Sequence, residues 1–201
     1  MTRVIQCATG SMGRTGLRRI IDAEELELVG AYVYGSTKVG ADAGALAKRD
    51  NIGVLATNDR AEILALDAEV VLHCPRITQP YDALVDDVVA LLESGKNVVS
   101  IAGFHWPAAH GAGYASRLEQ AALRGGVTLA GVGVNPGIVV ERLTMAATVM
   151  SHELDRVSVF ETVDASAMAS PEFVFGLMGL DSDPAERDIR QGPLADLYGT
   201  L

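Results

Sequence analysis

The chain has 201 residues, of which 49% are hydrophobic and 21% charged, and this globular composition indicates one large domain, or one domain followed by part of another. Its formal net charge of −10 excludes a nucleic-acid-binding surface, because no basic cluster offsets it. No apolar run approaches the roughly 20 residues that a membrane helix needs, and arginines interrupt the N-terminal stretch where a signal peptide would need an apolar core, so we expect a cytoplasmic protein.

Residues 4–21 combine a short apolar run, a glycine-bearing turn and a helical pattern. Strand, tight turn and helix in this order are the context in which a glycine-rich fingerprint predicts dinucleotide binding. The first N–H groups of a helix have no partner inside it, and the helix dipole adds partial positive charge, so a pyrophosphate can bind there. Aligned as GxGxxG, the turn has Ala8 at the first position, Gly10 where backbone approaches phosphate, and Gly13 and Gly16 for close helix–strand packing. A tight turn without a ligand is the alternative.

A second strand is predicted over residues 26–34, and the end of that strand normally meets the adenosine ribose of a dinucleotide. A carboxylate at that point would accept hydrogen bonds from the ribose hydroxyls, but the chain has Ser36, Thr37 and Lys38 instead. These side chains can donate hydrogen bonds and supply positive charge to a 2′-phosphate. The segment therefore favours NADPH, or the use of both cofactors, and an ordinary polar turn is the alternative.

The middle of the chain continues the alternation of strands and helices. Strands are predicted at residues 69–75, 98–101 and 127–130, and helices at residues 61–66, 80–94 and 114–123. This alternation predicts an α/β fold, a doubly wound parallel sheet of the Rossmann type, over residues 1–137. Cys7 and Cys74 fall in predicted buried strands, have no metal-ligand spacing and are expected to be free thiols.

The pattern changes after residue 137. An apolar helix is predicted over residues 138–150 and a half-exposed strand over residues 156–163, and apolar side chains crowd the segment 173–180. Apolar residues this dense should not lie on a free surface. We therefore expect residues 138–201 to be the start of a second α+β domain for substrate binding and dimerisation, incomplete in this chain or completed by a partner subunit. A homodimer is the expected assembly.

Three stretches carry a resemblance to a known family. They are residues 9–14, which read Thr-Gly-Ser-Met-Gly-Arg, residues 99–104, which read Val-Ser-Ile-Ala-Gly-Phe, and residues 133–137, which read Gly-Val-Asn-Pro-Gly. The chain resembles the dihydrodipicolinate reductase-like superfamily, and within it the branch of 2,4-diaminopentanoate dehydrogenase and the natural amine dehydrogenases. The resemblance implies an NAD(P)-dependent oxidoreductase that transfers hydride between nicotinamide and a small carbonyl, imine or amine.

The chain also departs from the patterns of this superfamily. Dihydrodipicolinate reductases carry a His-His pair followed by Lys in the second domain, whereas residues 161–165 contain neither residue type. The amine dehydrogenase branch has a glutamate in the loop after the fourth strand, whereas residues 103–106 contain no carboxylate. These departures argue against the dihydrodipicolinate reductase reaction itself. A different residue would have to supply the proton.

His105 is the acid/base candidate, because it follows the fourth predicted strand at the edge where the nicotinamide would lie. A loop histidine packed beside Trp106 is the alternative. The expected cofactor-binding residues, for NADP or NAD and without a metal, are Gly10, Ser11, Met12, Gly13, Ser36, Thr37, Lys38, Cys74, Pro75, Ser100, Ile101, Ala102 and Asn135. Two other functions stay open: imine reduction with bound water as the proton source, and a non-catalytic dinucleotide-binding or sensor module.

Overall fold

The computed structural model describes residues 1–76 and 84–160, together with residues 162, 164, 166, 171, 174 and 175. The chain divides into two compact units, residues 1–138 and residues 139–201. Whether a functional domain ends at residue 137 stays a prediction. The predicted helix start at Pro80 and most of the apolar segment 173–180 lie outside the described residues.

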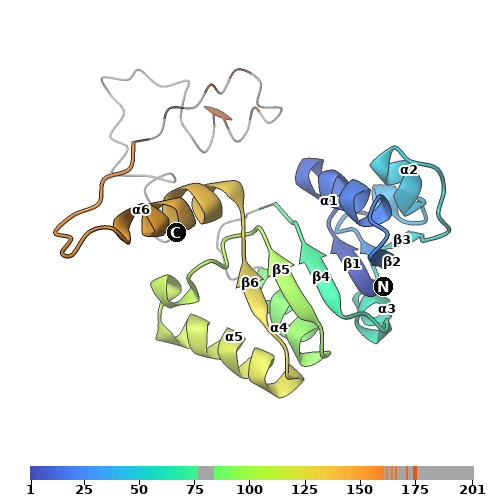
Figure 1. The fold of residues 1–201 in the computed structure, drawn as a ribbon. Coiled ribbons are helices and arrows are strands. Elements are labelled where there is room, and N and C mark those ends of the chain that lie inside the picture. Colours follow the sequence, from blue (N-terminus) through green and yellow to red (C-terminus); the bar gives the residue numbers. More distant parts are fainter. Residues whose placement is uncertain are drawn as a thin grey trace. The chain divides into compact units, whose positions relative to one another are not determined.

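A six-stranded sheet with the order β3-β2-β1-β4-β5-β6 forms the centre of the first unit (Figure 1). Its strands are β1 (Thr2–Cys7), β2 (Leu26–Tyr32), β3 (Ala56–Thr57), β4 (Val70–His73), β5 (Asn97–Ser100) and β6 (Leu129–Gly131). All neighbouring strands pair in parallel. The strand order reverses between β1 and β4. This arrangement confirms the predicted doubly wound α/β fold.

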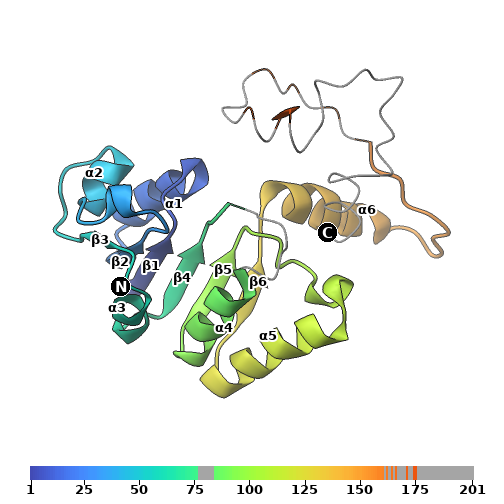
Figure 2. The same ribbon diagram turned by 180° about the vertical axis from the view of Figure 1, so that it is seen from behind.

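Helices cover both faces of the sheet (Figures 1 and 2). They are α1 (Ser11–Ile21), α2 (Ala43–Ala47), α3 (Arg60–Ala65), α4 (Val85–Glu93) and α5 (Ala112–Gly125), with short 3-10 turns η1 (Ser36–Lys38) and η3 (Pro107–His110). One buried core lies under α1 and α2, and a second lies under α3, α4 and α5. Val4 and Ile5 are neighbours on β1 and belong to different cores, as the alternation of side chains along a strand requires.

Local signals in the sequence explain several helix ends. The side chain of Asp59 caps α3, because it accepts hydrogen bonds from the backbone N–H groups of Ala61 and Glu62. Gly95 follows α4 with a φ of +79°, the left-handed conformation that commonly ends a helix. Helix α5 is longer than predicted at both ends and stops before Gly126, which has a φ of +65°.

The chain after β6 differs from the prediction. The π-helix η4 (Val134–Leu143) leads directly into α6 (Thr144–Thr148), where a single helix was expected over residues 138–150. The predicted strand over residues 156–163 is wrong for residues 156–160, which have no regular secondary structure. An alternating pattern makes a strand only where a neighbour pairs with it, and no described segment pairs with these residues. Within the described part of the chain, no helix has the length and apolar character needed to cross a bilayer.

Candidate dinucleotide-binding site

The turn between β1 and α1 leaves the start of the helix uncapped. Gly10 is the extended N-cap residue of α1, and it makes no side-chain cap hydrogen bond to the first turn. The first helical hydrogen bond runs from the N–H of Arg14 to the carbonyl of Gly10, at 2.9 Å. A Cβ atom at Gly10 would meet no heavy atom within 4 Å, so space is open in front of the helix end. Such an end binds anions, because its N–H groups and dipole both favour negative charge.

The two following glycines serve close packing. A Cβ atom at Gly13 would lie 2.0 Å from the carbonyl oxygen of Ala8. At Gly16 it would lie 2.6 Å from Leu72 Cδ2 and 2.7 Å from Gln6 Oε1. Side chains at these positions would push α1 away from the sheet. This is the role that the fingerprint predicted for them.

Ala8 lies at the first position of the fingerprint and has a φ of +69°. This is the left-handed region, where a glycine has no steric penalty but a residue with a Cβ atom does. Its N–H donates to the carbonyl of Tyr32 at 2.9 Å, and its own carbonyl accepts from Gln6 Nε2 at 2.9 Å. Hydrogen bonds on both sides of Ala8 therefore fix the turn.

The segment after β2 is tied to the same turn by Lys38. The Lys38 ammonium donates to the carbonyl oxygen of Thr9 at 2.8 Å and to its hydroxyl at 3.1 Å. Ser36 and Thr37 precede Lys38 in η1 and are exposed. The structure thus brings the predicted ribose-end residues next to the predicted pyrophosphate turn, with a positive charge between them.

A second hydrogen-bonded group lies at the ends of β4 and β5. His73 and Ser100 are paired across these strands and are fully buried, with His73 Nδ1 2.8 Å from Ser100 Oγ. The same hydroxyl accepts the N–H of Ala102 at 3.1 Å, which fixes the beginning of the loop after β5. Burial lowers the pKa of His73 to about 4, so the ring is neutral near pH 7. The ring thus lies in the core, and its Nε2 has no hydrogen-bond partner among the described residues.

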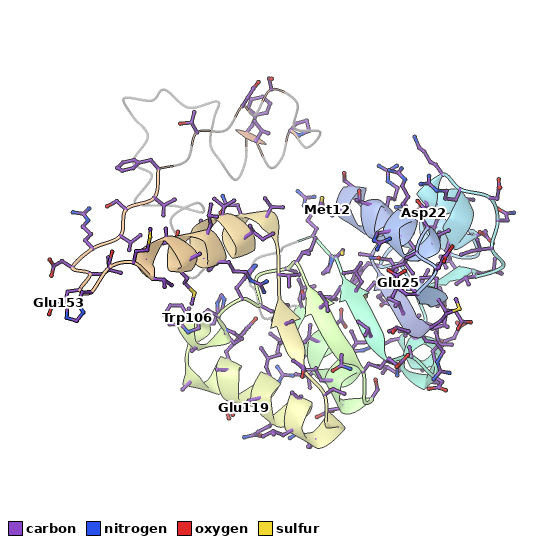
Figure 3. The ribbon with its side chains drawn as sticks, viewed as in Figure 1. Met12, Asp22, Glu25, Trp106, Glu119 and Glu153 are labelled. Atoms are coloured by element: carbon purple, nitrogen blue, oxygen red, sulfur yellow. The ribbon has the colours of Figure 1, made fainter. Side chains whose placement is uncertain are left out.

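The predicted cofactor-binding residues differ in how accessible they are. Ser11, Met12, Ser36, Thr37 and Asn135 are exposed along with Gly10, whereas Gly13, Cys74, Pro75, Ser100 and Ala102 are buried, and Lys38 and Ile101 are half-buried. Figure 3 shows Met12 at the start of α1. Buried side chains cannot reach a ligand directly, so only the backbone of the buried set is available for contact. Burial also raises the pKa of the Cys7 thiol to about 12 and raises that of Cys74, which keeps both thiols neutral.

His105 is held against the end of β6. Its Nε2 lies 3.0 Å from the carbonyl oxygen of Val132, and because a carbonyl only accepts, Nε2 carries the hydrogen. A Cβ atom at Gly131 would lie 2.2 Å from the carbonyl oxygen of Phe104, so the loop approaches the strand as closely as a glycine permits. Gly137 also lies close to the His105 ring, since a Cβ atom at this position would be 3.6 Å from His105 Nε2. These contacts leave Nδ1 as the nitrogen available for other chemistry.

An open hollow of about 470 Å³ lies beside this loop, between α5 and β6. Its walls are mainly apolar, and His105 and Glu119 are the titratable residues among those that line it. Trp106 is 66% exposed, and Figure 3 shows it with Glu119 on the loop and helix that border the hollow. None of the predicted cofactor-binding residues lines this hollow. The hollow is therefore separate from the turn that starts α1.

Two buried polar residues of the site region were not assigned a site role from the sequence. Gln6 interrupts the apolar run of β1, and that interruption is the signal that could have revealed it. The hydrogen bond between His73 and Ser100 depends on pairing between strands, because the two residues are 27 positions apart in the chain. No local pattern could have predicted that contact.

Comparisons with known proteins identify the family of this chain. The model of the family described as "Dihydrodipicolinate reductase, N-terminus" matches residues 1–104, which run from β1 to the loop after β5. The chain belongs to this family of dinucleotide-binding oxidoreductases. The predicted membership of the dihydrodipicolinate reductase-like superfamily is thereby confirmed.

This chain is also similar to amine dehydrogenases. An amine dehydrogenase from Streptomyces virginiae is 28% identical over 183 residues, which cover 90% of this chain and 51% of that protein. The solved structure of an amine dehydrogenase from Mycobacterium smegmatis has a TM-score of 0.59 at 24% identity, over 66% of this chain and 39% of that chain. The structural likeness shows a shared fold. The chain spans about half the length of the curated relative that it matches.

Proposed function

We propose that this protein is an NAD(P)-dependent oxidoreductase that transfers hydride between nicotinamide and a small carbonyl, imine or amine substrate. The start of α1 carries the proposal, because its N–H groups are uncapped and Gly10 borders open space. This helix end lies next to the point where the strand order reverses, between β1 and β4, where ligands bind in open α/β sheets. Family membership and the identity with an amine dehydrogenase support the assignment.

The residues at the carboxyl edge of the sheet fit a dinucleotide. The backbone N–H groups of Ser11, Met12 and Gly13 would bind its pyrophosphate, and Ser36, Thr37 and Lys38 would lie toward the ribose. At the ends of β4 and β5, backbone atoms of Cys74, Pro75, Ile101 and Ala102 would line its path, with the side chain of Asn135 exposed after β6. When bound, a nicotinamide cofactor supplies or accepts the hydride.

The choice between NADPH and NADH would rest on Lys38. Its ammonium group has three hydrogens and donates to two oxygens of Thr9, so one hydrogen is left for a phosphate. No carboxylate is present in residues 34–38 to repel a 2′-phosphate or to bind both ribose hydroxyls. We therefore propose a preference for NADPH, or no strong preference.

His105 would handle the proton through Nδ1. Its Nε2–H donates to the carbonyl of Val132, so proton exchange at that nitrogen would break the contact that holds the loop. In the direction of reduction, a protonated ring would give the Nδ1 proton to the substrate oxygen or nitrogen, and in the direction of oxidation the neutral ring would accept it. The ring keeps its position in both states because the Nε2–H is retained.

A non-catalytic dinucleotide-binding or sensor module is the second candidate. It is favoured by the absence of a carboxylate in residues 103–106 and by the structural hydrogen bond that already engages His105. Imine reduction with bound water as the proton source fits the same observations.

Binding and turnover together separate these functions. Calorimetric titration with NADPH and NADH tests the cofactor site, and either the oxidoreductase or the sensor requires binding of at least one. Oxidation of NADPH is then followed with a panel of ketones and aldehydes in the presence of ammonia. Omitting ammonia separates carbonyl reduction from reductive amination. Binding without turnover on any substrate supports the sensor, and no binding of either dinucleotide contradicts both candidates.

A cytoplasmic homodimer is the assembly that we propose. The apolar segment 173–180 supports it, because so many large apolar side chains close together favour burial against another surface. Sedimentation at micromolar concentration should show a dimer, and a stable monomer would contradict the proposal.

A further inference from the structure

Ala8 is an unusual residue for its place in the turn. In a dinucleotide fingerprint the first glycine makes the tight turn after β1, and here an alanine has the left-handed φ of +69° instead. Ala8 and Lys48 are the two non-glycine residues with positive φ in the described part of the chain. Something other than intrinsic preference must hold Ala8 in this conformation, because the Cβ atom disfavours it.

Gln6 supplies the contact that holds Ala8. Its Nε2 lies 2.9 Å from the carbonyl oxygen of Ala8, 3.1 Å from that of Cys7 and 3.4 Å from that of Leu72. Three carbonyl oxygens around one atom settle the orientation of the amide, because only its nitrogen can donate to them. The amide is fully buried in β1, two residues before Ala8, and it contacts the turn from the buried side.

The cost of burying this amide indicates that its donor is needed. Among the described residues, the buried Gln6 Oε1 has no partner other than the Cys74 thiol, a weak donor, and this is unfavourable for a polar atom. An apolar side chain of similar size would fill the same space without this penalty. The packing of α1 is also adapted to the amide, since a Cβ atom would lie 3.3 Å from Gln6 Nε2 at Gly13 and 2.7 Å from Gln6 Oε1 at Gly16.

The contact has a consequence for anion binding. The carbonyl of Ala8 is hydrogen-bonded by Gln6, and the next carbonyl, that of Thr9, is hydrogen-bonded by Lys38. Both oxygens are thus engaged by protein donors. A carbonyl oxygen turned toward a phosphate would repel it, whereas the uncapped N–H groups that follow attract it.

We propose that Gln6 is a positioning residue for the pyrophosphate turn, and that its amide replaces the conformational freedom of the missing first glycine by holding Ala8 in the left-handed conformation. This inference rests on the proposed dinucleotide-binding function. It has a specific corollary. Glycine adopts a positive φ without support, so the substitution Ala8→Gly makes the amide of Gln6 dispensable for ligand binding.

The test is a double-mutant cycle with Gln6→Met, Ala8→Gly and the combined variant. Methionine is close to glutamine in length but has no hydrogen to donate. Titration with NADPH and NADH should show about a tenfold loss of affinity in Gln6→Met, as expected for losing the hydrogen bonds that hold the site. Ala8→Gly alone should change affinity by less than about twofold, and the combined variant should recover most of the loss.

Lys48→Gly is the matched control. It also replaces a residue of positive φ, at the end of α2, and so relieves the same kind of strain away from the turn. It should raise the thermal midpoint of Gln6→Met without restoring affinity. Rescue by Lys48→Gly equal to that by Ala8→Gly would show a general effect of stability and overturn the proposal.

The other outcomes are equally decisive. Unchanged affinity in a folded Gln6→Met variant, or no rescue by Ala8→Gly, overturns the positioning role. If Gln6→Met does not fold, the combined variant must fold and bind, and its failure to do so shows that Gln6 is needed for something other than Ala8. If the unmodified protein binds neither dinucleotide, the proposed function itself is wrong and the positioning role with it, even if thermal unfolding still couples the two residues.

Discussion

The turn after β1 and the loop after β5 lie at the same edge of the sheet but are completed differently. In the turn, side chains engage the carbonyls of Ala8 and Thr9, and the N–H groups at the start of α1 are left uncapped. In the loop, the Nε2–H of the candidate acid His105 donates a hydrogen bond to the carbonyl of Val132, and the surrounding glycines fit closely around it. The first region leaves backbone N–H groups beside open space, whereas the second holds its own residues in place.

This difference explains why more of the proposed cofactor binding than of the proposed reaction follows from the structure. Anion binding needs only backbone groups, which the fold presents wherever a helix begins at a strand end. Proton transfer needs a particular side chain next to a particular substrate atom, and here the available nitrogen is limited to His105 Nδ1. The predictions below test each region separately.

The largest expected effect is the loss of turnover in His105→Ala. If Nδ1 exchanges the proton, turnover should fall about 100-fold or more, with dinucleotide affinity nearly unchanged. His105→Gln keeps a side-chain donor but cannot transfer a proton near neutral pH, so it should recover little. His110→Ala is the control, because it removes another histidine of the same stretch, in η3. Wild-type turnover in both His105 variants would assign His105 to packing and the proton to water or to another part of the protein.

The next largest effect is a loss of stability as pH falls. It is caused by His73, which contacts Ser100 just before the loop that follows β5. Burial lowers the pKa of His73 to about 4, below the value near 6.5 of an unfolded chain. As pH falls below 6.5, the unfolded state therefore binds a proton that the native state does not, and the free energy of unfolding decreases. His73 should account for a loss of roughly 2 kcal/mol between pH 7 and pH 4.5.

Urea unfolding of the unmodified protein and of His73→Asn at these two pH values measures that loss. Asparagine places a polar atom where His73 Nδ1 meets Ser100 and does not titrate. Its stability should therefore depend less steeply on pH, since only the other titrating groups remain. Equal pH dependence of the two proteins would mean that His73 does not titrate in this way.

In the turn after β1, Gly10→Val should weaken dinucleotide binding by well over tenfold. The branched side chain would fill the open space in front of α1, where no atom now lies within 4 Å of a Cβ position. Gly113→Val is the matched control, because Gly113 also borders open space but lies in α5, away from the turn. Calorimetry on both folded variants measures the effect. Equal affinity in the two would place the ligand elsewhere.

Local patterns in the sequence were sufficient for five of the six strands, though not for the two-residue β3, and for the close-packed glycines at the start of α1. They failed where the outcome depends on distant contacts. The alternation over residues 156–160 was read as a strand, although no described segment pairs with it. The conformation of Ala8 and the carbonyl that engages His105 are also set by tertiary structure, since Val132 is 27 residues away in the chain. Sequence reasoning therefore predicted the backbone of the turn after β1 better than the side-chain contacts around it.

The smallest expected effect is at Lys38, where the two readings of the segment after β2 diverge. If the ammonium group binds a 2′-phosphate, Lys38→Ala should weaken NADPH by about 1 kcal/mol, or roughly fivefold, and NADH by less. If Lys38 serves only to hold the carbonyl of Thr9, both cofactors should weaken equally, because the turn itself would loosen. Lys38→Met sharpens the distinction, since it keeps the length of the side chain and removes only its charge and donors.

Paired titrations with NADPH and NADH on the unmodified protein, Lys38→Ala and Lys38→Met give the ratio of the two affinities in each. That ratio cancels any general loosening of the turn, which affects both cofactors alike, and so isolates the contact with the 2′-phosphate. Raising the salt concentration should reduce the NADPH preference of the unmodified protein, because Lys38 is only half-buried and its charge is screened. A clear NADH preference in the unmodified protein, or a ratio unchanged by both substitutions, would assign Lys38 to the structure of the turn alone.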